Sequence, residues 1–344
     1  MKKKWLLFLS VLSFTLILVA CGDNEKTEAP STDGGSEEAT DWKPSKPIEI
    51  IAPAGAGGGW DTTARTVAKV LEEQKIVEQR FAVVNKPGGG GSIGWSYIKS
   101  KDTDDHLLFP TSPPIMFVPL NNQSDLGHKD FTPIAALTAD YGAYIVSADS
   151  PYENMNDLIE AMKNDPTSVS VVGVSSPGSM DHMQFIKSVG VAGVDVKDVK
   201  YVSAQDGNAM TMLLGGQVDV MSTDVGEAVE QYRAGNIRVL AITAPERLQD
   251  EIVSEFPTLI EQGIDDSFII WRGMMGPGNM SPEAAKFYEA ALKEMSETDE
   301  WKQELERYGW EPNWMGSEEF KKFLDEQYDT IEKLMIDIGL REQN

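Results

Sequence analysis

Short apolar runs alternate with segments of helical spacing through the middle of the chain. This pattern predicts helices over 156–164, 179–189, 207–214 and 225–234, separated by strands over 169–174, 199–202 and 218–221. Strands that alternate with helices form a parallel sheet with right-handed crossovers. The sequence therefore predicts a self-contained α/β lobe in this region.

Apolar runs on both sides of this lobe predict how it is connected. Residues 134–137 and 143–147 predict two strands that nearly run into one another, and residues 238–243 predict a return strand. Two connecting strands make a natural hinge, so we expect a lobe inserted within another lobe. The predicted boundaries are 45–141 and 243–344 for the first lobe and 142–242 for the inserted lobe.

The first lobe has its own predicted elements. Strands are expected over 48–52, 80–85 and 107–110, and helices over 61–74, through Met116 and Leu120, over 281–295 and over 317–340. The last helix carries an apolar stripe that includes Phe320, Leu324 and Ile331, a spacing typical of core packing. Trp271-Arg272-Gly273 precedes a further strand-like run. Two ordinary cores are expected from the roughly 300 residues involved.

The N-terminal 44 residues have a different character. Lys2, Lys3 and Lys4 precede an apolar run that ends in Leu18-Val19-Ala20-Cys21, which resembles a bacterial lipoprotein signal. The resemblance implies a signal peptide over 1–20 and a lipid thioether on Cys21, against the alternative of a buried structural cysteine. Residues 21–44 predict a flexible acidic tether, because they contain too few large apolar side chains to form a core. As the only cysteine, Cys21 can form no internal disulfide.

The formal net charge of the chain is −25, from 30 Lys and Arg against 55 Asp and Glu. Removal of the three signal lysines would make it more negative still. This charge argues against nucleic acid as a partner and against charge-driven docking on anionic lipid. It does not exclude an anionic ligand, since loop amides act at contact distance whereas surface charges are screened beyond about 8 Å.

Residues 48–65, IEIIAPAGAGGGWDTTAR, predict a strand, a glycine loop and a helix. Backbone N–H groups left unpaired at the positive end of a helix dipole can hold an anion. A second loop, KPGGGGS at 86–92, matches GxGxxG through Gly89, Gly91 and Gly94. Lys86 and Pro87 separate it from its strand, so we expect no nicotinamide cofactor. The loop could instead only allow close backbone packing.

Small polar loops follow three strands of the inserted lobe: SSPGS at 175–179, SAQDGN at 203–208 and STD at 222–224. Ligands of open α/β sheets bind at the carboxyl ends of strands, where such loops meet helix N-termini. Hydroxyl and amide groups here would hold a small polar ligand without formal cations. The alternative for Ser179 and Asp61 is helix capping, since each stands where an N-cap belongs.

These motifs together resemble the extracytoplasmic receptors of tripartite tricarboxylate transporters, of the Bug or TctC type. The resemblance also includes YVSAQDGNAMTMLLGGQVDV, RVLAITAPER and WRGMMGPGNMSPE, and extends from Lys46 to the final helix. It implies a two-lobed, type II-like periplasmic-binding-protein fold, with each lobe a mainly parallel sheet flanked by helices and two crossover strands between them. By position it implies these ligand-binding residues: Ala54, Gly57, Gly58, Asp61, Thr111, Ser112, Ser176, Gly178, Ser179, Asp206 and Gly207.

Three positions depart from the family pattern. Ala54 stands where Phe is common, Trp60 where Thr or Asn is common, and Thr223 where Asp is frequent, with the acid shifted to Asp224. The pocket shape and the role of that last loop are therefore open. Arg272 is either a cation near the cleft or part of a surface salt bridge.

Catalytic chemistry is not indicated. The histidines are His106, His128 and His182, and the adjacent Ser179, Asp181 and His182 cannot adopt the geometry of a triad. No GxSxG elbow or P-loop occurs, and Asp181 with His182 is a poor metal pair. We expect no metal and no cofactor.

The sequence therefore predicts a monomeric, lipid-anchored extracytoplasmic receptor that passes a small organic carboxylate to membrane permease subunits. An adhesion, assembly or sensing lipoprotein with the same fold is the alternative.

Overall fold

The computed structural model describes residues 42–204, 207–249, 252–337 and 340–342, and these belong to one compact unit. The predicted signal peptide, Cys21 and most of the predicted tether lie outside the described residues, as does Asp206. In the described ranges, no helix has both the length and the apolar character needed to cross a membrane.

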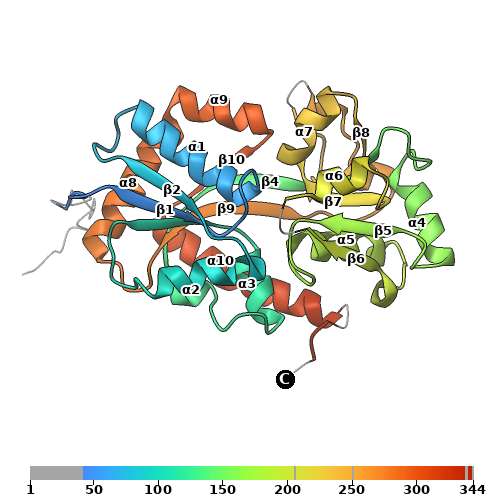
Figure 1. The fold of residues 1–344 in the computed structure, drawn as a ribbon, viewed down its shortest axis with the longest axis horizontal. Helices are drawn as coiled ribbons and strands as arrows, with labels where there is room; N and C mark the ends of the chain where they lie inside the picture. Colours follow the sequence, from blue (N-terminus) through green and yellow to red (C-terminus); the bar gives the residue numbers. More distant parts are fainter. Residues whose placement is uncertain (1–41, 205–206, 250–251, 338–339, 343–344) are drawn as a thin grey trace, which may run out of the picture. The chain divides into compact units, whose positions relative to one another are not determined.

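Ten strands of the described chain form one mixed sheet in the order β2-β1-β3-β9-β4-β7-β5-β6, with β10 and β8 also paired to β4 (Figure 1). Their bounds are β1 Ile48–Ala52, β2 Phe81–Asn85, β3 Leu107–Thr111, β4 Thr132–Ser147, β5 Ser170–Gly173, β6 Lys200–Ser203, β7 Val220–Asp224, β8 Ile237–Ile242, β9 Ile269–Gly276 and β10 Glu311–Met315. The pairs β1–β2, β1–β3, β5–β6 and β5–β7 are parallel, whereas every pair that contains β4 or β9 is antiparallel. The predicted α/β class is confirmed.

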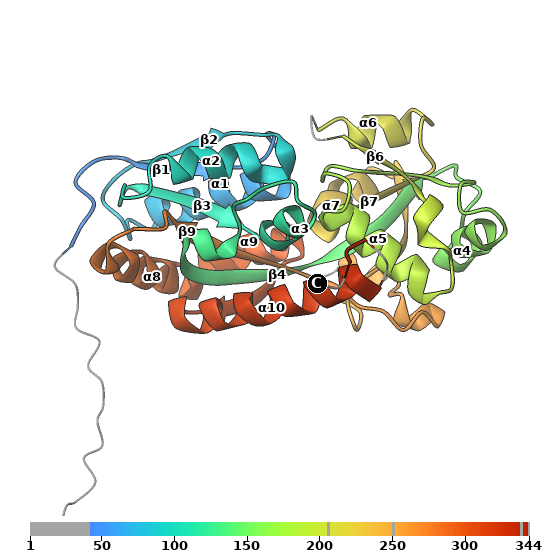
Figure 2. The ribbon, with the colours of Figure 1, turned by 90° about the horizontal axis from the view of Figure 1, so that it is seen from below.

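Strand β4 runs through both parts of the sheet (Figure 2). Its residues up to Tyr141 pair with β9, and its residues from Gly142 onward pair with β7 and β8. We call β1, β2, β3, β9 and β10 the first strand group, and β5 to β8 the second strand group. The two strands predicted over 134–137 and 143–147 are therefore one, because the polar residues between them are buried in the sheet. The chain returns from β8 to β9 through residues 243–268.

Helices cover both strand groups (Figures 1 and 2). Beside the first group lie α1 Gly59–Glu73, α2 Ser92–Lys99, α3 Pro114–Leu120, α8 Pro282–Glu297, α9 Asp299–Tyr308 and α10 Ser317–Asp337; beside the second lie α4 Met155–Asn164, α5 Met180–Val191, α6 Ala209–Leu214 and α7 Val225–Arg233. The sequence analysis missed α2, α9 and β10. Helix α9 is mostly charged and buries few apolar residues, chiefly Trp301 and Leu305, so its apolar pattern is weak.

Three apolar clusters hold these layers together. One lies within the first group around Ile50, Val67 and Leu292, and one lies within the second group around Val172 and Val229. The third cluster contains buried residues from both groups and the predicted stripe of α10. Each fully buried Leu, Ile or Phe contributes roughly 1.5–3 kcal/mol. The stripe of α10 is therefore core, as predicted.

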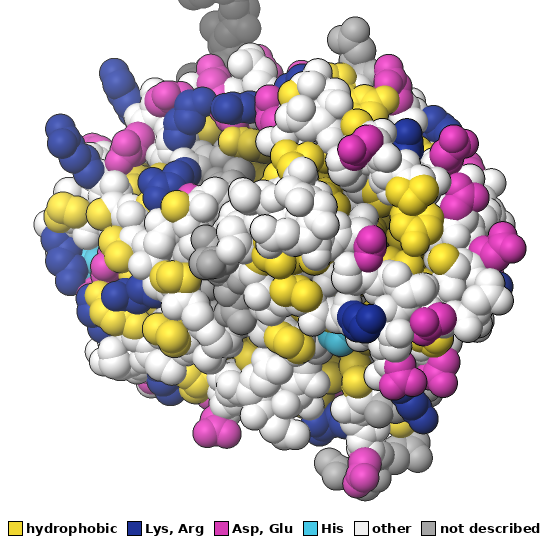
Figure 3. Space-filling view, turned by 45° about the vertical axis from the view of Figure 1, so that its right-hand side comes forward, with side chains coloured by type: hydrophobic (Ala, Val, Ile, Leu, Met, Phe, Trp, Pro, Cys, Tyr) yellow, Lys and Arg dark blue, Asp and Glu magenta, His cyan; other side chains and the backbone are white. Residues whose placement is uncertain are grey.

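The excess of acidic residues is not gathered in one block on the face shown in Figure 3. Acidic side chains there are dispersed and stand among lysines and arginines. The field inside a ligand site is thus set mainly by the groups that line it.

Candidate ligand-binding site

A cavity of about 110 Å³ lies where the loops that follow β1, β3, β5 and β7 meet the first turns of the next helices. Five predicted site residues line it: Ala54, Gly58, Ser112, Ser179 and Gly207. The structure does not place Asp61, Thr111, Ser176 or Gly178 in the cavity wall, and Gly57 lines only the second cavity described next. A second cavity of about 370 Å³ adjoins the first and shares Gly58, Glu227 and Arg272 with it.

Asp61 is hydrogen-bonded to the first glycine loop and does not line the cavity. Helix α1 begins at Gly59 with Gly58 as N-cap, so the prediction that Asp61 is the N-cap is wrong. Its carboxylate accepts hydrogen bonds from Gly57 N (2.8 Å), Asn85 Nδ2 (2.8 Å) and Arg65 Nε (3.0 Å). Burial opposes ionisation of Asp61, but these hydrogen bonds outweigh it and lower its pKa. Asp61 therefore fixes the shape of the loop.

Gly59 explains why the loop needs glycine at its helical end. A Cβ atom at this position would collide with the guanidinium of Arg272. The backbone of α1 can thus approach the arginine only without a side chain at Gly59.

Trp60 forms one wall of the cavity. Its Nε1 donates to Ser112 Oγ at 2.9 Å, which leaves the hydroxyl hydrogen of Ser112 to donate elsewhere. The ring packs edge-on against Trp95, and a Cβ atom at Gly91 would collide with both indoles. The second glycine loop therefore serves close packing, the alternative left open, and three of its glycines, Gly88, Gly90 and Gly91, also line the cavity.

Ser179 faces the cavity from the second strand group. It is the N-cap residue of α5, yet its side chain makes no capping hydrogen bond. Its Oγ is fully buried and has no hydrogen-bond partner within the described residues. A buried hydroxyl without a partner costs about 1–3 kcal/mol. The predicted capping role is thus wrong, and the hydroxyl is available to a bound molecule.

Ser176 and Gly178 form hydrogen bonds with the segment that follows α3. Ser176 Oγ donates to Gln123 Oε1 at 3.0 Å, Gln123 Nε2 donates to the carbonyl of Pro177 at 2.8 Å, and Asn121 Nδ2 donates to the carbonyl of Gly178 at 2.5 Å. We call these three hydrogen bonds the clasp. They connect the segment after α3 with the loop before α5, so the two predicted residues bind protein here. Predicted Thr111 lies within β3, opposite Gly273 of β9.

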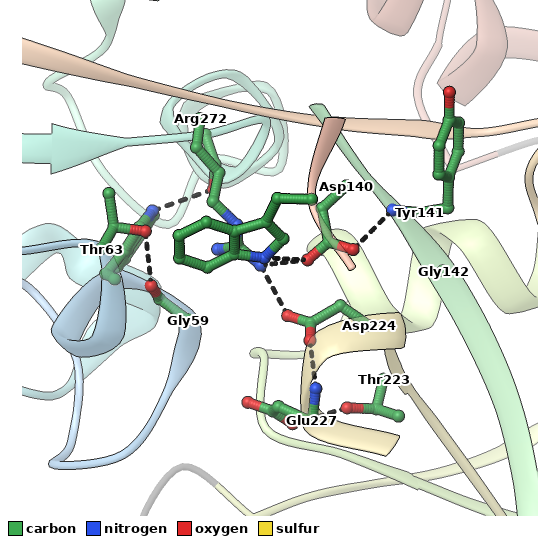
Figure 4. Close-up of polar contacts among 12 residues, drawn as sticks. Gly59, Thr63, Asp140, Tyr141, Gly142, Thr223, Asp224, Glu227 and Arg272 are labelled. Atoms are coloured by element: carbon green, nitrogen blue, oxygen red, sulfur yellow. Dashed lines mark hydrogen bonds and ion pairs between the residues drawn. The ribbon is translucent and has the colours of Figure 1, made fainter. Parts of the chain in front are cut away.

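Arg272 lines the cavity, and we call this residue and the acids around it the floor of the cavity. Figure 4 shows its contacts with Asp140 and Asp224. Arg272 lies within β9 and is only 2% exposed, so it forms neither a surface salt bridge nor the start of a strand. Its Nη2 contacts Asp140 Oδ2 at 2.9 Å and Asp224 Oδ2 at 2.6 Å, and Trp310 Nε1 donates to Asp140 at 3.1 Å. Burial opposes the charge of Arg272, but the two carboxylates outweigh it and raise its pKa.

Two further acids adjoin this ion pair. Asp224 caps α7 by accepting from Glu227 N at 2.8 Å, which settles the role of the shifted acid, and Glu227 Oε2 accepts from Thr223 Oγ1 at 2.5 Å. Asp181 accepts from the backbone N–H groups of Val174 and Ser175, both at 2.9 Å.

Burial is the largest cause that raises the pKa of these acids. It raises the pKa of Glu227 to about 8 and that of Asp140 to about 7, in each case with repulsion from Asp224. It also raises the pKa of Asp181 to about 7. The floor therefore holds more carboxyl groups than its single guanidinium can balance.

The sequence analysis missed Asp140, Glu227 and Trp310. An acid inside the apolar run of β4 was one available signal for Asp140, because a buried carboxylate requires a buried partner.

The histidine near the site has no catalytic partner. His182 Nδ1 accepts from Gly178 N at 2.8 Å, and its ring stacks on Tyr201. Burial lowers the pKa of His182 to about 4, so it is neutral at physiological pH. Across the described ranges, no group of three or more His, Cys, Asp or Glu side chains could hold a metal ion.

The curled mixed sheet with a cavity at the ends of its parallel strands is typical of the periplasmic-binding-protein fold. The structure matches a TctC solute-binding protein from Polaromonas with a TM-score of 0.61 and 27% identity, over 86% of this chain and 99% of that one. It also matches MatC from Rhodopseudomonas palustris with bound malate, with a TM-score of 0.73 and 22% identity, over 85% and 99% of the two chains. The second likeness concerns the fold alone.

Residues 63–340 match the tripartite tricarboxylate transporter family receptor, and the chain belongs to this family. A relative, the UPF0065 protein in the gbd 5′ region of Cupriavidus necator, is 26% identical over 300 residues, which cover 86% of this chain and 89% of the relative. The family is one of solute-binding receptors, so the prediction of a receptor and not an enzyme is confirmed.

Proposed function

We propose that this receptor captures a small organic carboxylate in the 110 Å³ cavity and delivers it to a membrane permease. One observation carries the proposal: the hydroxyl of Ser179 is fully buried, has no partner within the described residues, and lines the cavity. A carboxylate oxygen placed there would accept this hydrogen bond and remove the cost of the unpaired group. The malate bound in the structurally similar MatC supports the choice of ligand class.

Further donors would complete the carboxylate site. The hydroxyl of Ser112, oriented by Trp60, and the amide groups at the start of α1 face the same space. A helix N-terminus favours negative charge through its unpaired N–H groups and its dipole. The carboxylate would thus be held by neutral groups, because the nearest guanidinium is already paired with two acids.

Closure of two lobes would complete this site around the ligand. We assign residues 45–141 and 243–344 to one lobe and 142–242 to the other, with the hinge in β4 and in residues 243–268. Ser112 and Ser179 come from different lobes on this assignment. A ligand that contacts both would bind the closed form more tightly and so shift the population toward it.

The N-terminal segment and the family support the proposal of a lipid anchor and a permease partner. A lipid on Cys21 and the acidic tether over 21–44 would hold a monomeric receptor outside the cytoplasm, near the permease. Cys21→Ala should release the protein from the membrane fraction. Retention of the variant in that fraction would contradict the anchor without affecting the binding proposal.

A calorimetric titration of the full-length chain with a panel of mono-, di- and tricarboxylates tests the proposed function. We expect at least one acid to bind with a 1:1 ratio and to reduce the radius of gyration measured by X-ray scattering. If no member of the panel binds, the cavity does not serve carboxylates. Binding without any change in scattering would contradict lobe closure only.

A further inference from the structure

The chain already contacts the first strand group at Trp42, where the described residues begin. Its indole lies among three rings, with centroid distances of 5.3 Å to Phe287, 5.6 Å to Tyr288 and 5.6 Å to His106. The rings of Phe287 and Tyr288 meet the indole edge-on, a favoured geometry for aromatic pairs. We call His106, Phe287 and Tyr288 the Trp42 pocket.

The walls of the Trp42 pocket are joined to each other by contacts of their own. Phe287 and Tyr288 are neighbours on α8, and their rings pack edge-on with centroids 5.6 Å apart. Tyr288 is buried, and its hydroxyl donates to the carbonyl of Asp105 at 2.8 Å. This hydrogen bond joins α8 to the segment that carries His106. The connection between the walls therefore does not depend on the indole.

The residues between the indole and β1 continue this contact. Pro44 is buried, and Ser45 N donates to His106 Nε2 at 3.0 Å. Lys46 Nζ forms an ion pair with Asp104 at 3.2 Å. Ring packing, a backbone hydrogen bond and an ion pair thus hold the segment that leads into the first strand.

The Trp42 pocket and the cavity lie at opposite edges of the first strand group. His106 directly precedes β3, and β1 and β3 are parallel, so the pocket is at the amino ends of these strands. The cavity is at their carboxyl ends. In both views the start of the described chain lies beside α8, at the end of the first strand group that is farther from the second (Figures 1 and 2). The residues of the pocket all belong to the proposed first lobe.

We propose that the Trp42 pocket is a docking site for the end of the tether, and that it fixes the anchor to the first lobe. The docking itself is independent of the ligand, whereas its consequence for the anchor rests on the proposed lipid at Cys21. The residues from Cys21 to residue 41 would then form the free tether, with an extended length of at most about 75 Å. Lobe closure would move the inserted lobe and leave the attachment in place.

The membrane interface is the competing place for this side chain. Tryptophan is enriched at membrane–water interfaces, and Trp42 is the first large apolar residue after Cys21. The three ring contacts and the hydrogen bond of Ser45 favour the pocket. Residues 22–41 offer no other candidate for docking, since they contain no aromatic residue, Ile, Leu, Met or Val.

Chymotrypsin, which accepts large apolar side chains, reports whether Trp42 is docked. The first bond after Cys21 that it can cut is the bond after Trp42. Limited digestion of the full-length protein, in the cell fraction that contains it, measures the rate at which the fragment that begins at Lys43 appears in mass spectra. This rate follows the population in which the indole has left the pocket. Phe287→Ala should raise the rate about tenfold or more, whereas Phe287→Tyr, which keeps a ring, should stay within about threefold of the natural protein.

Phe323→Ala is the matched control, because Phe323 is also a partly buried phenylalanine of the proposed first lobe but packs on Trp271 and Phe320. It should leave the rate of the cut unchanged. A natural chain that is cut as fast as Phe287→Ala would overturn the docking. Should that variant fail to fold, His106→Ala removes another ring of the pocket and takes its place.

Cys21→Ala separates the pocket from the membrane. Docking needs no lipid, so this variant should be cut after Trp42 as slowly as the natural protein. A faster cut in Cys21→Ala would place the indole in the membrane interface and overturn the inference. Absence of carboxylate binding would contradict the proposed function and leave the rate of the cut unchanged.

Discussion

Two sets of residues in the cavity wall, one around Ser179 and one around Arg272, differ in how they treat charge, and we call them the Ser179 end and the Arg272 end. The Ser179 end includes the hydroxyls of Ser112 and Ser179 and the indole of Trp60, beside glycine backbone and apolar side chains, and Arg272 is the one Lys or Arg among the described residues that line the cavity. At the Arg272 end, a buried cation is present but is enclosed by Asp140 and Asp224. The comparison indicates that the arginine is a structural ion. Under the proposed function, neutral donors would then carry the recognition of the anion.

The largest expected effect concerns the Arg272 end. Arg272→Met would leave two buried carboxylates without their partner, and such a loss costs about 3–5 kcal/mol of unfolding free energy. Urea denaturation followed by circular dichroism measures this change in unfolding free energy. Lys322→Ala, which removes an exposed pair with Glu326, is the control and should change the unfolding free energy by less than about 0.5 kcal/mol. A folded Arg272→Met variant of ordinary stability would mean that the arginine is not a structural ion.

The next effect concerns the loop behind the Ser179 end. Asp61→Ala removes the acceptor for Gly57, Asn85 and Arg65, so the unfolding free energy should fall by about 1–3 kcal/mol. Because Asp61 does not line the cavity, ligand affinity should change by less than about threefold, or 0.7 kcal/mol. Asp61→Asn, which keeps an acceptor for Gly57, should lose less stability. A large loss of affinity with unchanged stability would instead make Asp61 a ligand-binding residue.

A smaller effect is expected when a hydrogen bond of the clasp is removed, and this change tests lobe closure separately from ligand contacts. Gln123→Ala removes one donor and one acceptor between the two strand groups, each worth about 0.5–1.5 kcal/mol. We expect the ligand-free variant to show a larger radius of gyration and a weaker apparent affinity than the natural protein. Ser124→Ala, beside it and bonded only to Leu126 N among the described contacts, is the control. Scattering identical to that of the natural protein would show that the clasp does not hold the closed form.

The smallest effect is the dependence of stability on pH. Glu227, with a pKa raised to about 8, keeps its proton in the folded protein at pH values where the unfolded chain has released it. Stability from this group is therefore complete below the ordinary Glu pKa and decreases as pH rises toward 8. Asp140 and Asp181, raised to about 7, act in the same direction.

Glu227→Gln should make this decrease shallower. Melting temperatures of the ligand-free protein at pH 5 and pH 8 measure this decrease, and it should be smaller by about 2 °C or more in the variant than in the natural protein. Parallel curves for the two proteins would contradict the raised pKa.

The loops of the Ser179 end could be predicted from the sequence, whereas the ion pairs of the Arg272 end could not. The glycine loop at 55–59 and the serine loop at 175–179 are local motifs, so their place after strands could be predicted. Which hydroxyl lines the cavity depends on long-range packing, because Ser176 donates to Gln123 in the clasp, whereas Ser179 lines the cavity and has no partner among the described residues. Asp140 and Arg272 are 132 residues apart and meet only through the pairing of β4 with β9. No local pattern encodes that register.

Ser179→Ala tests the central claim most directly, because among the described residues it removes the one buried hydroxyl that lines the cavity without a partner. Calorimetric titration with the tightest acid of the panel should show a loss of affinity of about tenfold or more, as for a hydrogen bond to a charged group. Unfolding free energy should not decrease, since no hydrogen bond within the described protein is lost. Unchanged affinity in a folded variant would contradict the claim that this end of the cavity binds the carboxylate.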